Sequence, residues 1–324
     1  MSHFDVFNGD ADGICALHQL RLAQPLESTL VTGVKRDIAL LERVTAQTGD
    51  SVTVLDVSLN RNREALLRLL QQGVRVEYFD HHFADAVAAH PGLNVHIDPA
   101  PTVCTSLIVD RHLQGQHRLW AIVGAFGDNL GKSAQPLIQA LDLDAPQIAQ
   151  LRALGEAMNY NAYGDSEADL LVPPAMLYAS LRAYANPFDF YANSPNTAKL
   201  LEGRRADMER ARAQQPAYVL PSGNVYVLPA TSWARRVHGS FANELALHAT
   251  ERAHAVLSAD ARGDYVVSVR APVARPSGAE HLCLQFPSGG GRAAAAGIDH
   301  LAQERLQEFI DAFKQAFGLG CDSK

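Results

Sequence analysis

The chain has 324 residues, 47% of them hydrophobic, and exceeds the ~100–200 residues of one typical domain, so we expect two domains with full cores. The net charge of −7 and pI of about 6.0 argue against a globally basic surface for long nucleic acids, so an anionic substrate would need a local patch. No window reaches ~18 uninterrupted apolar residues and the first residues lack a signal-peptide pattern, so we expect a soluble cytoplasmic protein.

The first half of the chain alternates short apolar runs with segments of helical period. Such β-α alternation predicts a mostly parallel sheet covered by helices on both faces, with ligands bound beyond the carboxyl ends of the strands. The predicted strands are 3–7, 28–34, 51–58, 74–80 and 93–97, and the predicted helices are 14–23, 36–49 and 62–73.

In the second half of the chain the sequence pattern changes twice, first to polar helical segments and then to strand-like runs. Residues 136–216 are helical and polar with proline-containing breaks, and strand-like runs begin at about residue 217. These runs, the last of them 280–286, precede an amphipathic helix over 300–317. We therefore predict an α/β fold with a catalytic domain over 1–150, a helical connector over 151–216, a smaller α/β domain over 217–324, and a cleft between the two α/β domains.

The four cysteines are far apart in the sequence, form no CxxC pair, and three of them lie in apolar segments. This pattern predicts reduced core thiols rather than disulfides. They are Cys15, Cys104, Cys283 and Cys321.

Three of the predicted N-terminal strands finish on aspartates. Asp10 and Asp12 come after strand 3–7, Asp56 lies near the end of strand 51–58, and Asp80 ends strand 74–80 and is followed by His81 and His82. Because parallel strands end at one edge of the sheet, these carboxylates should converge there, and they repel each other unless a cation neutralises them. Carboxylates with one or two imidazoles favour Mn²⁺ or Mg²⁺ over structural zinc.

Each of these residues also has a plainer interpretation. Asp12 or Asp56 alone is typical of a helix N-cap, and an isolated His-His pair is typical of a surface turn. The coincidence at several strand ends favours the metal cluster, because capping alone would also have used Ser, Thr and Asn. Asp128, in "GAFGDNLG", is positioned to complete the cluster.

The motifs "GDADGICA", "VLDVS", "FDHH" and the Gly127–Asp128 pair resemble, in this order, the four motifs of the DHH phosphoesterase superfamily. That superfamily includes RecJ-type exonucleases, nanoRNases and cyclic-dinucleotide phosphodiesterases, and its second domain is called DHHA1. The resemblance implies that one or two Mn²⁺ ions are held, with Asp56 bridging two of them, and that His82 and Asp80 lie beside the ions in catalytic roles. The implied ligands are Asp10, Asp12, Asp56, His81 and Asp128.

The chain departs from the family pattern at two positions near the first motif. Val6 stands where many members have a histidine, and Asn8 stands where RecJ-like members have an acid. We therefore expect one metal site with fewer or weaker ligands than usual, and the carbonyl oxygen of Asn8 as a metal or substrate contact.

A glycine-rich segment, "FPSGGGRAAAAGI", resembles the GGGH-type loop of DHHA1 domains, with Arg292 in place of the histidine. We expect this loop to follow a strand and open onto a helix, where backbone N–H groups and the helix N-terminus would bind a phosphate; a flexible loop is the plainer interpretation. Arg270 ends a predicted strand and matches a substrate contact of DHHA1 domains. Arg235, Arg236 and His238 form either a solvated face or a further phosphate contact. The predicted substrate-binding residues are Arg270, Gly289, Gly290, Gly291 and Arg292.

These features predict a metal-dependent phosphodiesterase that acts on short oligonucleotides or linear dinucleotides. A long single strand would favour a basic track with aromatic platforms, and only 7% of the residues are aromatic. The alternatives are a RecJ-like exonuclease, a cyclic-dinucleotide or bisphosphonucleotide phosphoesterase, a haloacid dehalogenase-type phosphatase with Asp10 as nucleophile, and a non-catalytic nucleotide-binding module. No membrane partner is expected, and a homodimer stays open.

Overall fold

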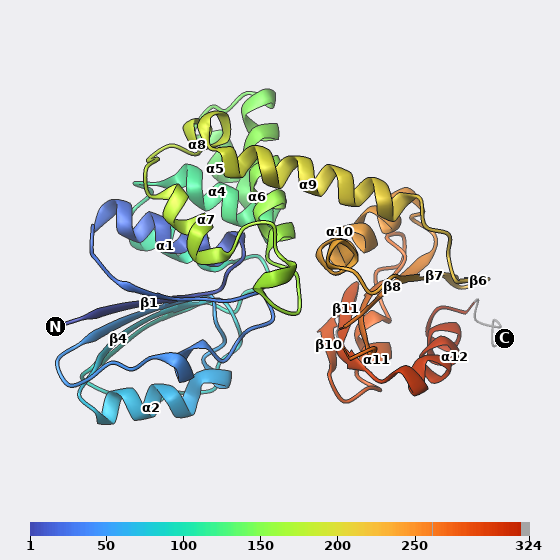
Figure 1. The fold of residues 1–324 in the computed structure, drawn as a ribbon, viewed down its shortest axis with the longest axis horizontal. Coiled ribbons are helices and arrows are strands. Elements are labelled where there is room, and N and C mark those ends of the chain that lie inside the picture. The colour runs from blue at the N-terminus through green and yellow to red at the C-terminus, as the bar shows by residue number, and fades with distance from the viewer. Residues whose placement is uncertain (261, 319–324) are drawn as a thin grey trace. The chain divides into compact units, whose positions relative to one another are not determined.

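The computed structural model describes residues 1–260 and 262–318. The chain divides into two compact units, Met1–Gly203 and Arg204–Lys324. The division falls within α9 (Pro195–Arg212), the long helix labelled in Figure 1. The expected separation of residues 151–216 as a connector stays a prediction.

The first unit contains a five-stranded, wholly parallel sheet in the order β2-β1-β3-β4-β5. This confirms the parallel sheet expected from the β-α alternation. The strands are β1 (His3–Phe7), β2 (Thr29–Val31), β3 (Ser51–Leu55), β4 (Arg75–Asp80) and β5 (Leu93–Ile97).

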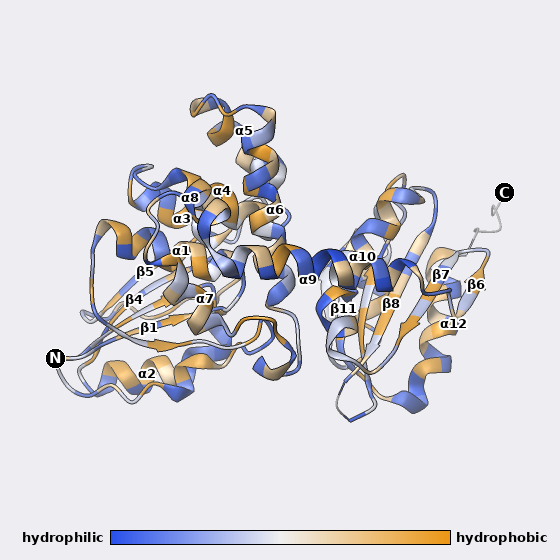
Figure 2. Cartoon of the chain, turned by 45° about the horizontal axis from the view of Figure 1, so that its top comes forward, coloured by the Kyte–Doolittle hydropathy of each residue, from blue (hydrophilic) through white to orange (hydrophobic). Residues whose placement is uncertain are grey.

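Both faces of this sheet are covered, as Figure 1 shows. Alternate side chains of a strand point to opposite faces, so Phe7 packs into the helical layer while Val6 packs against α2 (Arg63–Gln71) and the segment before β3. The apolar stripe of α2 and its polar outer side are visible in Figure 2, and Leu66, Leu69 and Leu70 are buried as predicted.

The helical layer on the other face places α1, α3, α4 and α6 in mutual contact. Its buried core includes Ile14, Leu17, Trp120 and Phe190. The helices of the unit besides α2 and α9 are α1 (Ala11–Ala23), α3 (Thr105–His112), α4 (Arg118–Gly127), α5 (Gly131–Ala140), α6 (Ala145–Asn161), α7 (Pro174–Leu181) and α8 (Pro187–Asn193).

The helix predicted over 36–49 is wrong. Only one 3₁₀ turn, Leu40–Arg43, forms there. Of the apolar face expected for this helix, Leu41 and Val44 are buried, whereas Ile38 is exposed. The side chain of Asn62 replaces the helical hydrogen bonds, because its Oδ1 accepts from Leu41 N–H at 3.0 Å and its Nδ2 donates to the Ile38 carbonyl at 2.7 Å.

The second unit contains a six-stranded mixed sheet in the order β10-β11-β9-β8-β7-β6, in which only β7 and β8 run parallel. Helix α10 (Ser232–His248) packs against β8 and β9, and α12 (Leu306–Phe317) contributes Phe309 and Phe313 to the core. The remaining elements are β6 (Tyr218–Leu220), β7 (Gly223–Leu228), β8 (Ala253–Ala259), β9 (Tyr265–Arg270), α11 (Ala279–Cys283), β10 (Gly289–Arg292) and β11 (Ala295–Leu301).

Two predictions around the glycine-rich segment are wrong. Residues 280–286, expected as a strand, contain most of α11, and the segment opens onto no helix, because Gly289–Arg292 and Ala295–Leu301 form an antiparallel hairpin. The alanines favour a helix locally, but β11 pairs with β9 along most of its length, and this pairing overrides the local preference. The expected phosphate cradle at a helix N-terminus is therefore absent at this place.

Cys15, Cys104 and Cys283 are buried free thiols, whereas Cys321 lies outside the described residues. In the described part of the chain, no helix combines the length and the apolar character that crossing a membrane requires.

Candidate metal centre

The carboxyl ends of β1, β3 and β4 are neighbours in the sheet, and the predicted acidic and histidine side chains gather there. Ligand atoms of Asp12, His81 and Asp128 lie within 4.8 Å of one another, and so do those of Asp56, His81 and His82. His81 belongs to both groups, so the structure brings together four of the five expected metal ligands. The fifth, Asp10, lies beside them and is held differently.

Asp56 occupies a strained position at the end of β3. Its φ of 59° is in the left-handed region, which aspartate tolerates better than most residues, and its side chain is buried. The Asp56 N–H still donates to the Phe79 carbonyl at 3.0 Å, which continues the ladder between β3 and β4. The hydroxyl of Thr105 donates to Asp56 Oδ1 at 3.1 Å, which fixes the carboxylate.

Asp12 is oriented by the N-terminus of α3. The backbone N–H groups of Thr105 and Ser106 donate to its two carboxylate oxygens, each at 2.7 Å. A helix N-terminus favours such an anion, and each carboxylate oxygen keeps a further lone pair for a cation.

Gly127 explains how Asp128 reaches the cluster. A Cβ at residue 127 would lie 2.3 Å from the Cβ of Ala11 and 3.0 Å from the carbonyl oxygen of Gly155. Only glycine permits α4 to approach α1 and α6 this closely. Asp128 then follows directly as the C-cap of α4, and its Oδ2 lies 3.9 Å from His81 Nε2.

Asp10 and Asn8 make local contacts as well as facing the cluster. Asp10 is the N-cap of α1, with Oδ1 accepting from the N–H groups of Asp12 and Gly13 at 3.0 and 3.1 Å. Asn8 Oδ1 accepts from Asp10 N–H at 3.1 Å, and Asn8 Nδ2 donates to the Lys35 carbonyl at 3.1 Å. Asp10 is thus the residue to which the capping interpretation applies, and Asn8 holds the turn that presents it.

Lys35 is the functional candidate that the sequence analysis missed. Its Nζ donates to Asp10 Oδ2 and to Asn159 Oδ1, the latter at 3.0 Å, and lies 3.6 Å from Asp128 Oδ1. The available signal was its position after β2, the strand next to β1. Thr105 and Ser106, at the N-terminus of α3, were missed as well.

The charges in the cluster are strongly coupled. Burial and the neighbouring carboxylates raise the pKa of Asp12 and, well above its usual range, that of Asp56. Burial disfavours charge on His81, but the hydrogen bond and charge of Asp56 outweigh it and raise the pKa of His81 to about 10. The pKa of Asp10 is lowered despite burial, because Lys35 stabilises its charge.

These residues fit a divalent cation. Carboxylate oxygens and one imidazole nitrogen within 4.8 Å of one another match the donors that Mn²⁺ and Mg²⁺ accept, and burial and neighbouring carboxylates, which raise the pKa values of Asp12 and Asp56, disfavour the charged carboxylates unless positive charge is added. A bound cation would supply it.

Asp80 and His82 form a pair beside the cluster. The fully buried Asp80 accepts from the His82 N–H at 3.2 Å, and its Oδ1 lies 2.6 Å from His82 Nδ1. This contact assigns the proton to Nδ1 and leaves Nε2 as the nitrogen outside this pair, on a side chain that is 43% exposed.

In the second unit, Arg270 and Arg292 lie in one row of the sheet. Both pair with Ala295, Arg292 from β10 and Arg270 from β9, so the two arginine side chains leave the same face on either side of a small residue. Arg270 Nε donates to Asn243 Oδ1 on α10 at 2.6 Å, which orients its guanidinium. Gly289, Gly290 and Gly291 lie in β10 itself.

Arg236 and His238 point inward rather than forming a solvated face. Arg236 is buried and donates to Asp207 Oδ2 through Nε and Nη2 at 3.0 and 2.6 Å. His238 is also buried and its Nδ1 contacts the Arg235 carbonyl at 2.8 Å. These contacts account for both side chains without a substrate.

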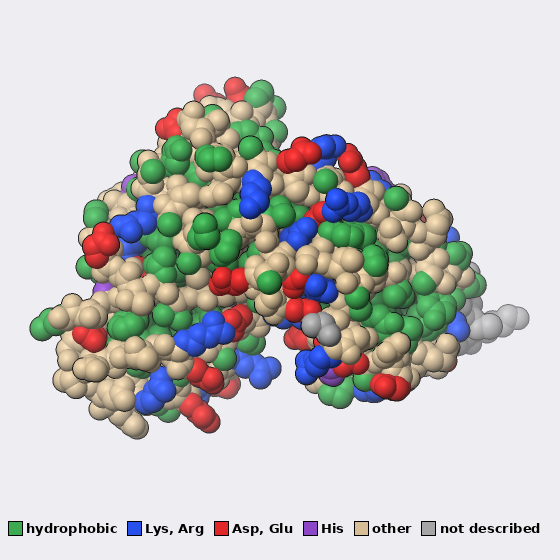
Figure 3. Space-filling view, in the orientation of Figure 1, with side chains coloured by type: hydrophobic (Ala, Val, Ile, Leu, Met, Phe, Trp, Pro, Cys, Tyr) green, Lys and Arg blue, Asp and Glu red, His purple; other side chains and the backbone are tan. Residues whose placement is uncertain are grey.

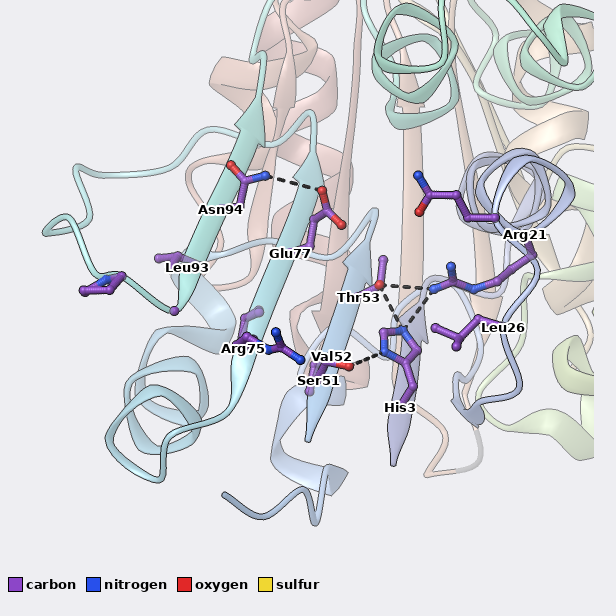
Figure 4. A pocket seen from close by; sticks show the side chains of 14 residues that line it. His3, Arg21, Leu26, Ser51, Val52, Thr53, Arg75, Glu77, Leu93 and Asn94 are labelled. Atoms are coloured by element: carbon purple, nitrogen blue, oxygen red, sulfur yellow. Dashed lines mark hydrogen bonds between the residues drawn. The ribbon is translucent and has the colours of Figure 1, made fainter. Parts of the chain in front are cut away.

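A cavity of about 380 Å³ lies at the opposite, amino-terminal ends of the strands (Figure 4). The polar side chains along it bond to one another: His3 Nδ1 lies 2.7 Å from Ser51 Oγ, and Arg21 donates to Asp5 and Thr53. Because several of its polar side chains bond to one another and none of the metal-ligand groups found among the described residues lines it, we assign this cavity a structural role.

The parallel sheet with acids and histidines at its carboxyl edge, followed by a mixed sheet, is a fold that the chain shares with solved structures of an exonuclease and of a phosphodiesterase, so the predicted fold is confirmed. The chain is similar to exonuclease RecJ bound to manganese, with 16% identity and a TM-score of 0.60 over 97% of this chain and 89% of that one. It is similar to RecJ in complex with Mn²⁺ from Thermus thermophilus, with 16% identity and a TM-score of 0.57 over 97% of this chain and 51% of that one. It is also similar to PggH, a pGpG-specific phosphodiesterase from Vibrio cholerae, with 14% identity and a TM-score of 0.52 over 98% of this chain and 99% of that one. No protein-family model and no curated protein matches the sequence.

Proposed function

We propose that this chain is a metal-dependent phosphodiesterase that hydrolyses short oligonucleotides or linear dinucleotides. The observation that carries the proposal is that Asp12 with Asp128, and separately Asp56, lie in groups that share His81 and could hold a cation, on a fold shared with an exonuclease and a dinucleotide phosphodiesterase. No side chain is required as a covalent nucleophile.

One or two Mn²⁺ ions would be held by Asp12, Asp56, His81 and Asp128. Asp10 would be a further ligand if its ion pair with Lys35 breaks. When bound, such an ion acidifies a water molecule and neutralises the charge that develops on the phosphoryl oxygens. The N-terminus of α3 keeps the Asp12 carboxylate in place, and Thr105 does the same for Asp56. Pre-organised ligands lose little freedom on binding.

His82 would contact the scissile phosphate or its leaving oxygen. Asp80 accepts a hydrogen bond from Nδ1 and so leaves Nε2 as the nitrogen that can donate a proton to the leaving oxygen when the imidazole is protonated. In this assignment Asp80 is a positioning residue that acts through His82.

Arg270 and Arg292 would bind a terminal phosphate or base of the substrate. Their placement in one row across Ala295 supports a shared anionic ligand, since two guanidinium groups on one face can donate to the same phosphate. The hairpin replaces the expected helix N-terminus, so the arginine side chains carry this role rather than a helix dipole.

Short substrates agree with the charge distribution. On the face drawn in Figure 3, lysine and arginine side chains lie among aspartate and glutamate side chains and form no continuous basic track. A single-strand exonuclease acting on long DNA would favour such a track.

The test is a panel of 5′-phosphorylated 2- to 20-mers, cyclic dinucleotides and bisphosphonucleotides, each incubated with the protein and Mn²⁺, with products resolved by chromatography. We expect the highest rates on the 2- to 5-mers and none with EDTA. Rates that rise with length would identify a RecJ-like exonuclease, and tight binding without turnover of any substrate would identify a nucleotide-binding module.

A further inference from the structure

Phe83 differs from every other aromatic residue in ranges 1–260 and 262–318. Its side chain is 70% exposed, whereas the other Phe, Tyr and Trp side chains described are buried or half-buried. An exposed phenyl ring gives up the stabilisation that burial provides to the core phenylalanines. Its exposure therefore calls for a specific explanation.

The backbone around Phe83 is held firmly, so a loose loop does not explain the exposure. Asn60 Oδ1 accepts from Asp85 N–H at 3.1 Å, and Arg63 donates to the carbonyls of Asp85 and Ala86 at 3.0 and 3.2 Å. Neighbouring Ala84 and Val87 pack against the core. The smaller apolar side chains of this segment, Ala84 and Val87, are therefore partly buried, whereas the phenyl ring of Phe83 is exposed.

Phe83 directly follows His82 at the edge of the metal-ligand cluster. Consecutive Cα atoms are about 3.8 Å apart, so the ring begins one residue from the imidazole that would contact the scissile phosphate. His81, one residue further back, has its ring centroid 4.5 Å from that of His82. Phe83 is therefore the exposed aromatic residue that directly follows, in the chain, the residues that would hold the phosphate of a nucleotide.

We propose that Phe83 is a stacking platform for the base of the nucleotide next to the scissile phosphate. The proposal rests on the proposed function and adds to it a residue that selects nucleotide substrates over other phosphodiesters. A phenyl ring offers no hydrogen bond, so this contact recognises a base by its π-face and tolerates any sequence.

The first experiment measures binding. A dinucleotide carrying 2-aminopurine and a non-hydrolysable methylphosphonate link is titrated with wild type in Mn²⁺, and quenching of its fluorescence is followed. We expect Phe83→Ala to weaken binding about 5- to 150-fold, the equivalent of about 1–3 kcal/mol, and to reduce the quenching at saturation. Phe83→Tyr should restore both.

The matched control is Leu26→Ala, at an apolar side chain that is 46% exposed and lines the cavity at the far ends of the strands. It should bind and quench as wild type does. Unchanged binding and quenching in Phe83→Ala, absence of quenching in wild type, or a dimer that Phe83→Ala converts to monomers would each overturn the stacking role; the last would make the ring a subunit contact.

The second experiment compares kcat/KM for a 5′-phosphorylated dinucleotide with kcat/KM for its analogue in which both sugars lack bases. Phe83→Ala should lower the first and leave the second unchanged, and equal losses would overturn the proposal. A wild type that hydrolyses neither substrate, while quenching still depends on Phe83, would refute the proposed hydrolysis and leave the stacking role in place.

Discussion

The Nε2 atom of His81 lies 3.3 Å from Oδ1 of Asp56, although the two residues follow different strands of the sheet. The contact exists because β3 and β4 are parallel neighbours whose carboxyl ends coincide. It places one imidazole among several buried carboxylates, and the pKa of Asp56 is raised well above its usual range by burial and by the charges of Asp10 and Asp12.

Asp56→Ala tests this arrangement. It removes the central carboxylate, so Mn²⁺-dependent hydrolysis should fall below about a tenth of the wild-type rate, a barrier change above ~1.4 kcal/mol. The variant should also lose most of the rise in unfolding temperature that Mn²⁺ gives wild type, since only a bound ion stabilises the folded state. Differential scanning calorimetry with Mn²⁺ and with EDTA measures this second effect. A variant with more than a tenth of the activity would contradict the assigned role.

Lys35→Met tests the competition between the ammonium group and the metal. Without Lys35, the buried Asp10 lacks its partner, and we expect a loss of about 2–3 kcal/mol of unfolding free energy in EDTA, below the range for fully buried pairs because Lys35 is partly exposed. Mn²⁺ should restore more stability to this variant than it adds to wild type, because the ion takes over the neutralisation of Asp10 and Asp128.

Urea unfolding with Mn²⁺ and with EDTA gives these free energies, and titration calorimetry gives the Mn²⁺ affinity, which should rise. The control is Lys132→Met at an exposed lysine of α5, which should change neither quantity. Equal Mn²⁺ effects in wild type and Lys35→Met would mean that Lys35 does not compete with the ion.

Part of the metal-ligand cluster could be predicted from the sequence, because some of its residues lie directly at the end of a recognisable strand. Asp56, Asp80 and His81 follow apolar runs, and a parallel sheet must bring such positions to one edge. Lys35 could not be recognised in the same way, because β2 has only three residues and the lysine follows it after a short loop. Asn159 belongs to a helix whose approach depends on tertiary packing.

The errors in the fold share one cause. Hydrophobic spacing reports which side chains are buried and does not report where the backbone hydrogen bonds go. Over 36–49, Leu41 and Val44 are buried as expected although Ile38 is exposed, but Asn62 supplies hydrogen bonds that a helix would have made. Over 295–298 the neighbouring strand β9 supplies them.

His18 predicts a pH dependence of stability. Burial lowers the pKa of His18 from 6.5 to about 4, although a hydrogen bond from Nε2 to the Tyr184 carbonyl at 2.8 Å opposes this. The unfolded chain therefore binds more protons between about pH 4 and 6.5, so stability should fall as the pH falls through this window, by roughly 3 kcal/mol in all and about 2 kcal/mol by pH 5.

His18→Gln keeps a donor for Tyr184 but does not titrate, so its unfolding free energy should fall less between pH 7 and 5. The chain has two tryptophans, and in a Trp233→Phe background the fluorescence of Trp120, which contacts His18, follows the first unit alone. His90→Gln, at an exposed histidine, should retain the wild-type pH dependence. Identical slopes for wild type and His18→Gln would show that His18 does not remain neutral in the fold.

Arg292→Ala and His82→Ala together test the division of roles between the two units. A charge-assisted hydrogen bond is typically worth ~1.5–3 kcal/mol, and only a substrate long enough to reach Arg292 can gain it. Arg292→Ala should therefore lower kcat/KM for a 5′-phosphorylated dinucleotide about 10- to 150-fold and leave bis-p-nitrophenyl phosphate nearly unaffected. His82→Ala should lower both, because the imidazole acts at the scissile phosphate. Equal losses on the two substrates for Arg292→Ala would make the β10–β11 hairpin structural, and the substrate would then have to be held by the first unit alone.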